Sequence, residues 1–183
     1  MKHIEHKPFL AALLAVTAVG LAACLATLGV RADDEVTILT ASLRGVNEVP
    51  AINSNATATF RAVIHSNGSI TFKETFSDLT SNAILSHIHF GKVHVAGGVM
   101  IWLCGGGGQP PCPAATSGTF EGTITAANVT GPTSQGVTAG DLASALRAVR
   151  EGAGYVNLHS VNFPAGEARG QVIVHRGEGD DEN

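Results

Sequence analysis

Short segments in which apolar and polar residues alternate with a period of two fill most of the chain beyond residue 36. Successive side chains of a β-strand point to opposite faces, so this pattern is typical of strands with one buried face. The segments are also rich in Thr, Val, Ile and Phe, which favour strands. We expect strands at residues 36–43, 56–64, 69–76, 83–89, 99–103, 118–125, 154–159 and 168–175. About eight short strands predict an all-β fold, either a Greek-key-like β-sandwich or a flattened barrel.

One segment, at about residues 138–151, departs from the alternation and predicts a short helix. Thr138 and Asp141 have the spacing of a capping box, with Asp in place of the usual Glu. Apolar residues then recur at helical spacing, at Leu142, Leu146 and Val149. Gly152 supplies a stop signal. We therefore expect a single helix of about three turns on the β-structure.

The first 32 residues have the features of a segment that directs export. Lysines precede a long apolar run, and small residues surround Ala32, after which a leader peptidase could cut. Residues 21–24 (Leu-Ala-Ala-Cys) also resemble a lipobox, which would place a lipid on Cys24. The apolar run is long enough to span a bilayer uncleaved. Residues 1–32 are thus expected to be a signal peptide or an N-terminal anchor, with the rest periplasmic, at the cell surface or extracellular.

Charge and length limit what the exported part can be. Residues 1–32 hold three basic and one acidic side chain, which leaves 8 of 11 basic and 14 of 15 acidic residues, a formal charge of about −6. Such a surface repels phosphates, so nucleic-acid binding is not expected. Residues 36–175 suit one compact domain. The acidic, glycine-containing tail at residues 176–183 is expected to be disordered.

Two cysteines of the exported part, Cys104 and Cys112, enclose a run of four glycines. In an oxidising compartment, two thiols that close a short loop are expected to form a disulfide. The alternative is a pair of thiolate metal ligands. It is disfavoured because such ligands usually lie two to four residues apart, and the exported part has no second pair.

Histidines supply the clearest candidate site. Alternation places His87 and His89 on one strand face, and it places His159 on one face of another strand with Asn157 and Tyr155. If these strands are neighbours, three imidazoles converge and could bind zinc or copper. His94 could add a fourth ligand. The alternative is that the histidines bind backbone carbonyls and hold the strands in register.

Other candidate residues favour structure over catalysis. Glu167 and Arg169 lie two apart on one strand and could form an ion pair or fix the preceding turn, and Glu48 could act likewise. Trp102 lies among apolar strand residues and is expected in the core. The sequence contains neither a Gly-x-Ser-x-Gly elbow nor a phosphate-binding glycine loop.

Four motifs in order resemble those of the chordin-type (CHRD) domain family. They are Leu-Arg-Gly-Val-Asn-Glu-Val-Pro at 43–50, His-Ile-His-Phe-Gly at 87–91, Gly-Ala-Gly-Tyr-Val-Asn-Leu-His at 152–159 and Pro-Ala-Gly-Glu-Ala-Arg-Gly-Gln at 164–171. The resemblance covers roughly residues 37–174. Ser160 stands where the family commonly has threonine, and His94 falls in a stretch that is usually glycine-rich.

The resemblance implies a β-rich domain found in chordin, an extracellular antagonist of growth-factor signalling, and in many exported bacterial proteins. It implies no known reaction for the bacterial members. The chain lacks the cysteine-rich modules of chordin, so growth-factor antagonism does not carry over. We expect an exported, non-enzymatic module that binds an extracellular protein or a surface ligand. The alternative is a metal-binding protein that uses His87, His89 and His159.

Overall fold

The structure, a computed structural model, describes residues 36–176. The expected signal or anchor at residues 1–32, Cys24 and the tail from residue 177 lie outside the described part. The strands of this part are β1 (Thr37–Arg44), β2 (Thr57–Ile64), β3 (Ile70–Ser77), β4 (Ala83–Phe90), β5 (Gly98–Cys104), β6 (Gly118–Ile124), β7 (Gly154–Ser160), β8 (Ala168–Gln171) and β9 (Ile173–Arg176). The helices are α1 (Leu142–Arg150) and the 3-10 helices η1 (Gly45–Asn47), η2 (Ala126–Asn128) and η3 (Thr133–Gln135).

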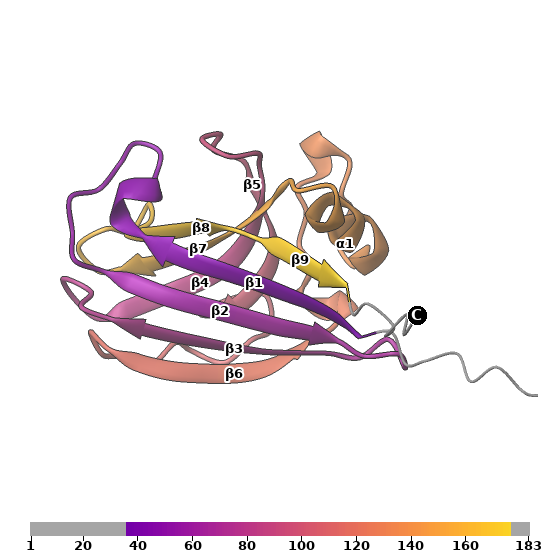
Figure 1. The fold of residues 1–183 in the computed structure, drawn as a ribbon, viewed down its shortest axis with the longest axis horizontal. Coiled ribbons are helices and arrows are strands. Elements are labelled where there is room, and N and C mark those ends of the chain that lie inside the picture. Colours follow the sequence, from indigo (N-terminus) through magenta and orange to yellow (C-terminus); the bar gives the residue numbers. More distant parts are fainter. Residues whose placement is uncertain (1–35, 177–183) are drawn as a thin grey trace, which may run out of the picture. The chain divides into compact units, whose positions relative to one another are not determined.

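The strands form one antiparallel sheet that curls into a nearly closed barrel (Figure 1). Its order is β5-β4-β7-β8-β1-β2-β3-β6, and β9 continues along β1 beyond β8. The two end strands approach each other where Val129, after β6, forms a bridge with Ile101 of β5. The amide of Thr130 also donates to the carbonyl oxygen of Met100 (3.0 Å). The expected all-β fold with one short helix is confirmed, in its barrel form.

Alternation in the sequence decides which side chains fill the barrel. Every second residue of β2 is buried, from Ala58 through Phe60 to Ile64, and the residues between them are exposed or half-buried. The tight turn between β2 and β3 follows from Asn67 and Gly68, because the Asn67 side chain accepts from the Ser69 amide (2.9 Å) and Gly68 has φ 80°. Burial of the inward rows supplies the main driving force for this arrangement.

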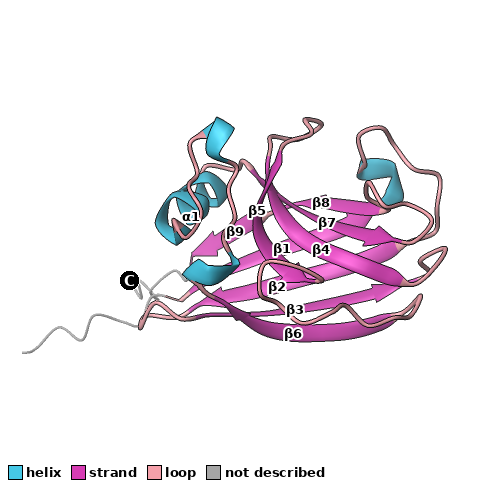
Figure 2. Cartoon of the chain, turned by 180° about the vertical axis from the view of Figure 1, so that it is seen from behind, coloured by secondary structure: helices cyan, strands magenta, loops and turns pink. Residues whose placement is uncertain are grey.

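Helix α1 is shorter than the sequence predicted. It begins at Leu142 because Asp141 itself is the N-cap, and its side chain accepts from the Ser144 amide (2.9 Å). The expected capping box from Thr138 is therefore wrong. Ala145, Ala148 and Val149 of α1 join the barrel core, and Figure 2 shows the helix beside β9. Within residues 36–176, no helix has the length and apolar character needed to cross a membrane.

The last predicted strand, at residues 168–175, is interrupted in the structure. Val172 separates β8 from β9, and its amide donates to the carbonyl oxygen of Gly154 (2.9 Å) instead of continuing the ladder with β1. As a result β8 pairs mainly with β7, whereas β9 pairs with β1. In the sheet, β7 therefore lies between β4 and β8, and the candidate site is formed on these strands.

Candidate metal centre

Three histidines gather on the outer face of the neighbouring strands β4 and β7. The strands pair with His87 opposite Asn157 and with Leu85 opposite His159. The ring centroids of His87 and His89 lie 4.5 Å apart. The His159 centroid lies 4.5 Å from that of His87 and 6.5 Å from that of His89. The structure thus brings together the three imidazoles that alternation placed on matching faces.

The ring nitrogens of this histidine cluster are arranged around one point. Each histidine offers one ring nitrogen that lies within 4.8 Å of those of the other two. The buried nitrogens without a hydrogen-bond partner are Nδ1 of His87, Nε2 of His89 and Nε2 of His159. Such unpaired buried polar atoms are rare in native proteins, so three of them together call for a ligand.

Backbone carbonyls orient two of the rings. Nδ1 of His89 donates to the carbonyl oxygen of Gly97 (2.8 Å), and Nδ1 of His159 donates to that of Pro164 (3.0 Å). A carbonyl oxygen only accepts, so both Nδ1 atoms carry the hydrogen and both Nε2 atoms present a lone pair. Hydrogen bonds of this kind typically fix the tautomer and orientation of metal-binding histidines. Backbone oxygens here take the role that carboxylates often have beside such histidines.

Burial keeps the three imidazoles neutral. It lowers the pKa of His87 to about 2, with further lowering from the charges of His159 and His89. It lowers the pKa of His89 to about 4 and also lowers the pKa of His159, in each case against a hydrogen bond to a carbonyl. A neutral imidazole is the form that binds a metal ion. The free nitrogens are therefore available as ligands at neutral pH.

The loop between β4 and β5, residues 91–97, lies close to the cluster and is held by Arg169. Nη2 of Arg169 donates to the carbonyl oxygens of Lys92 (3.1 Å) and Val95 (2.9 Å). The guanidinium also lies 3.5 Å from the centroid of the Tyr155 ring, a cation–π contact. Tyr155 in turn accepts from the amide of Gly97 (3.2 Å). Arg169 and Tyr155 thus fix the loop whose Gly97 carbonyl orients His89.

Alternation predicted that the outward face of β7 is exposed, but this face is buried. Tyr155, Asn157 and His159 do point away from Val156 and Leu158, but all seven residues of β7 are buried. A period-two pattern reports direction and cannot report whether a loop covers the outer face. His94, the expected fourth ligand, is exposed on residues 91–97 and does not belong to the cluster.

Two aromatic side chains contact the histidines: Tyr155, which alternation placed on the face of His159, and Trp102, which the sequence did not link to the site. The Tyr155 ring stacks on His89 with centroids 4.7 Å apart. The Trp102 ring meets His87 edge to face at 4.9 Å. Trp102 is half-buried and not in the core, contrary to expectation. Its position opposite His87 in the β4–β5 pairing is the signal that could have found it.

Glu48 and Asn157 form a buried polar pair near the cluster. Nδ2 of Asn157 donates to a carboxylate oxygen of Glu48 and to the carbonyl oxygen of Ala168 (3.2 Å). Burial raises the pKa of Glu48 to about 7, against the Asn157 hydrogen bond and the charge of Arg169. A Cβ on Gly166, whose φ is 126°, would lie 2.7 Å from Glu48 Oε1, so this position requires glycine. The structural role of the pair stays a prediction.

Glu167 and Arg169 have separate partners. The two carboxylate oxygens of Glu167 accept from the amide (2.9 Å) and the hydroxyl (3.2 Å) of Thr80. Arg169 binds the loop carbonyls described above, so the alternative of an ion pair between the two residues is not what the structure shows. The expected disulfide is present between Cys104 and Cys112, whose Cα atoms are 5.0 Å apart.

The donor set suits zinc or copper. Imidazole nitrogens are good ligands for both ions, and three protein ligands leave a coordination position for water or another ligand. Within residues 36–176 the cluster contains three histidines without a carboxylate or a thiolate. Since the rings come from strands joined by a backbone ladder, the site needs little rearrangement to accept an ion.

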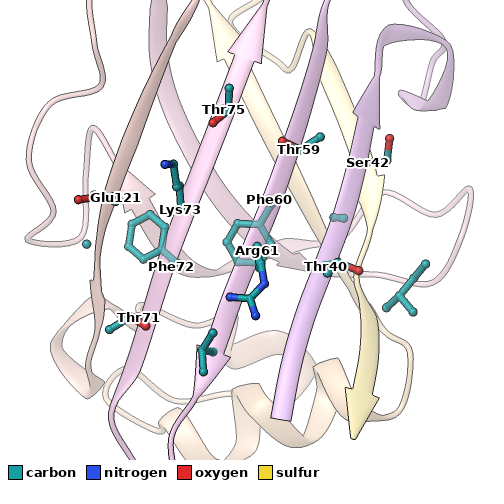
Figure 3. Close-up of a pocket in the computed structure, with 14 residues that line it drawn as sticks. Thr40, Ser42, Thr59, Phe60, Arg61, Thr71, Phe72, Lys73, Thr75 and Glu121 are labelled. Carbon is teal, nitrogen blue, oxygen red and sulfur yellow. The ribbon is translucent and has the colours of Figure 1, made fainter. Parts of the chain in front are cut away.

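A second feature lies on the other side of the barrel, on the outer face of β1, β2, β3 and β6. It is a shallow groove of about 840 Å³. Figure 3 shows its hydroxyl-bearing and charged side chains on adjacent strands. Arg61 and Lys73 lie directly opposite each other in the β2–β3 pairing, and Glu121 lies opposite Lys73. Like charges in that position are unfavourable without a counter-charge, and Glu121 supplies one beside Lys73 but not beside Arg61.

Comparison with known proteins identifies the family of the chain. The family model described as CHRD domain matches residues 39–172, which include the histidine cluster and the disulfide. No curated protein and no solved structure matches the chain. The matched range begins in β1 and ends at Val172, between β8 and β9, so it contains nearly all of the barrel. The chain therefore belongs to the CHRD domain family.

Proposed function

We propose that this CHRD domain binds a zinc or copper ion through His87, His89 and His159. Two observations support this most: each histidine has one buried ring nitrogen without a partner, and each offers a ring nitrogen within 4.8 Å of those of the other two. Leaving a buried polar atom unpaired costs about 1–3 kcal/mol, and a shared ion would remove that cost for all three. Histidines that served only to hold strands in register would have no reason to direct their second nitrogens at one another.

The chain's own residues would prepare the site. Gly97 and Pro164 hold the protons of two imidazoles on Nδ1, and the aromatic rings around the cluster exclude water. A bound zinc ion would supply Lewis acidity, and a bound copper ion would supply one-electron chemistry. The three histidines would hold either ion, and the low polarity around them would strengthen its electrostatic interactions.

Metal content of the purified full chain tests this proposal. After incubation with zinc or copper sulfate and gel filtration, elemental analysis should find about one ion per chain. His89→Ala should lose it, whereas His94→Ala, an exposed histidine on the adjacent loop, should keep it. Circular dichroism checks that both variants fold. Equal metal content in His89→Ala and wild type, or metal-free wild type, would overturn the proposal.

A second candidate function is the interaction module expected from the sequence. The groove on β1, β2, β3 and β6 supports it, because Arg61 and Lys73 give this face two adjacent cations in an acidic protein. Binding of dextran sulfate, a polyanion, can be measured by calorimetry. Neutralising both cations (Arg61→Gln with Lys73→Gln) should abolish binding. The same change at the exposed Arg147 and Arg150 of α1 should not, and equal losses in both variants would contradict this candidate.

We also propose that the domain works outside the cytoplasm, in the cell envelope or beyond it. The apolar segment before residue 32 and a disulfide that an oxidising compartment favours both support this. Mass spectrometry of the native N-terminus tests it. A start at Asp33 supports cleavage and a lipid on Cys24 supports a lipoprotein, whereas an unmodified Met1 in a soluble cytoplasmic fraction contradicts export.

A further inference from the structure

The glycine run between the two cysteines lies against the ring of Trp102. A Cβ on Gly106 would lie 2.5 Å from Cε3 of Trp102, and a Cβ on Gly107 would lie 2.7 Å from its Cβ. Real Cβ atoms essentially never come within 3.0 Å of another heavy atom. Glycine is therefore required at both positions for the loop to pack flat on the indole.

This glycine loop, residues 105–108, is held at both ends and in the middle. The disulfide from Cys104 to Cys112 closes it. Inside it, the amide of Gly105 donates to the carbonyl oxygen of Pro110 (2.8 Å). The side chain of Asn128 donates to the carbonyl oxygen of Gly107 (2.9 Å). The loop thus forms a fixed wall on one side of Trp102.

Trp102 also packs against His87, the ligand histidine whose Nδ1 has no carbonyl partner. Gly97 and Pro164 orient His89 and His159, whereas Nδ1 of His87 has no hydrogen-bond partner in residues 36–176. The His87 ring is instead enclosed by other rings. The Trp102 centroid lies 4.9 Å away, and those of His89 and His159 lie 4.5 Å away.

A hydrogen bond also fixes Trp102, so that the position of the indole depends on the glycine loop. Its Nε1 donates to the hydroxyl of Thr130 (3.0 Å). With this bond on its edge and the glycine loop against it, the indole has little freedom to move. Packing against such a fixed ring restricts the side-chain rotation of His87, as a hydrogen bond would for another ligand.

We propose that Trp102 is the positioning residue for the metal ligand His87, and that the disulfide-closed glycine loop sets its position. This inference rests on the proposed metal site. It follows that metal affinity depends on the intact disulfide. A dithiol reductant would break the S–S bond, leave two cysteine thiols and become a disulfide itself, and the freed loop would no longer hold Trp102 against His87.

Zinc affinity of the full chain, measured by calorimetry with zinc sulfate alone, tests the inference. Gly106→Ala should bind zinc about 10- to 100-fold more weakly, the usual effect of disturbing a group that orients a ligand. Gly108→Ala is the control in the same loop, because its φ of 77° strains the backbone while the nearest atom to its Cβ is 3.8 Å away, so this variant disturbs the loop without meeting Trp102. It should bind zinc as wild type does.

Two further variants separate positioning from general stability. Trp102→Ala should weaken zinc binding as Gly106→Ala does, and Trp102→Phe should restore most of it by keeping an aromatic edge on His87. Replacing both cysteines by alanine should also weaken binding, at a temperature where circular dichroism shows a folded protein. Since Trp102 is the single tryptophan of the chain, a shift of its emission in Gly106→Ala reports directly that the indole has moved.

The outcomes distinguish the two proposals. Wild type that binds no zinc or copper removes the metal site and this inference with it. Wild type that binds metal, together with Trp102→Ala of equal affinity, overturns the positioning role and leaves the metal site standing. Should Gly106→Ala fail to fold, the Trp102→Ala and Trp102→Phe pair decides alone. Equal affinity in the cysteine double variant removes the dependence on the disulfide.

Discussion

Glu74 lies inside the barrel between two phenylalanines of β3, Phe72 and Phe76. Burial raises its pKa to about 8, against a hydrogen bond from the Ser86 hydroxyl to Oε2 (2.7 Å). Its Oε1 has no partner. The carboxyl is therefore protonated at neutral pH. Glu74 takes an inward position of β3, and a glutamate in a strand gives no sign in the sequence that it will be neutral.

Glu74 should make the folded state sensitive to alkaline conditions. Its pKa is higher in the folded than in the unfolded chain, where the ordinary value is 4.5. Between these values the folded state binds more protons at Glu74, so the contribution of this group to stability falls as pH rises from about 4.5 to 8, by up to about 1.4 kcal/mol per pH unit. Glu74→Gln should remove this dependence, as urea unfolding at pH 5, 6.5 and 8 would show.

The exposed Glu121 of β6 supplies the control for this measurement. Glu121→Gln should keep the same slope of stability against pH as wild type, since its side chain reaches water. Equal slopes in all three proteins would mean that Glu74 is ionised in the folded barrel.

The histidine cluster shows how much of the candidate site could be predicted from the sequence. Alternation put His87 and His89 on one face and His159 on a matching face. These three histidines come together only if β4 and β7 are neighbours, and the sequence alone could not predict that pairing. The contact of Trp102 with His87 likewise depended on β4 and β5 being neighbours. The position of residues 91–97 is that of a loop, whose path has no periodic signal.

At the level of elements, Arg169 of β8 holds the loop of residues 91–97 in place. Arg169→Lys keeps a positive charge but loses the planar group that stacks on Tyr155 and reaches two carbonyls. We expect a loss of about 1–3 kcal/mol in the free energy of unfolding. Hydrogen exchange should also become faster at the Gly97 amide. The same change at the exposed Arg150 should alter neither quantity, and unchanged exchange at Gly97 would contradict the bracing role.

Helix α1 offers a second test at this level, because the predicted capping box began at Thr138 whereas the N-cap in the structure is Asp141. Asp141→Ala should lower the thermal midpoint by about 3–6 °C, since the Ser144 amide loses its acceptor. Thr138→Ala should leave the midpoint unchanged, because Thr138 is exposed and its hydroxyl caps nothing in the described structure. Differential scanning calorimetry measures both midpoints. A lower midpoint for Thr138→Ala and an unchanged one for Asp141→Ala would support the capping box from Thr138. The sequence predicted the helix but misplaced its start because both residues are good caps.

For the whole molecule, the sequence predicted the strands better than their order. Local alternation and turn residues locate β1 to β7 within about two residues, since both are short-range effects. The neighbours β4 and β7 are separated by more than fifty residues and by α1, and no local signal specifies such a pairing. The division of residues 168–175 into β8 and β9 likewise depends on Gly154, an acceptor distant in sequence.

This long-range pairing has a consequence for stability that can be measured. A metal ion held by His87, His89 and His159 would connect β4 to β7, and only the folded chain brings these residues together. Free zinc at 100 times its Kd should therefore raise the free energy of unfolding by about 2.7 kcal/mol. Urea unfolding should show this gain in wild type and in His94→Ala but not in His159→Ala. A gain of equal size in His159→Ala would mean that zinc stabilises the barrel from some other place.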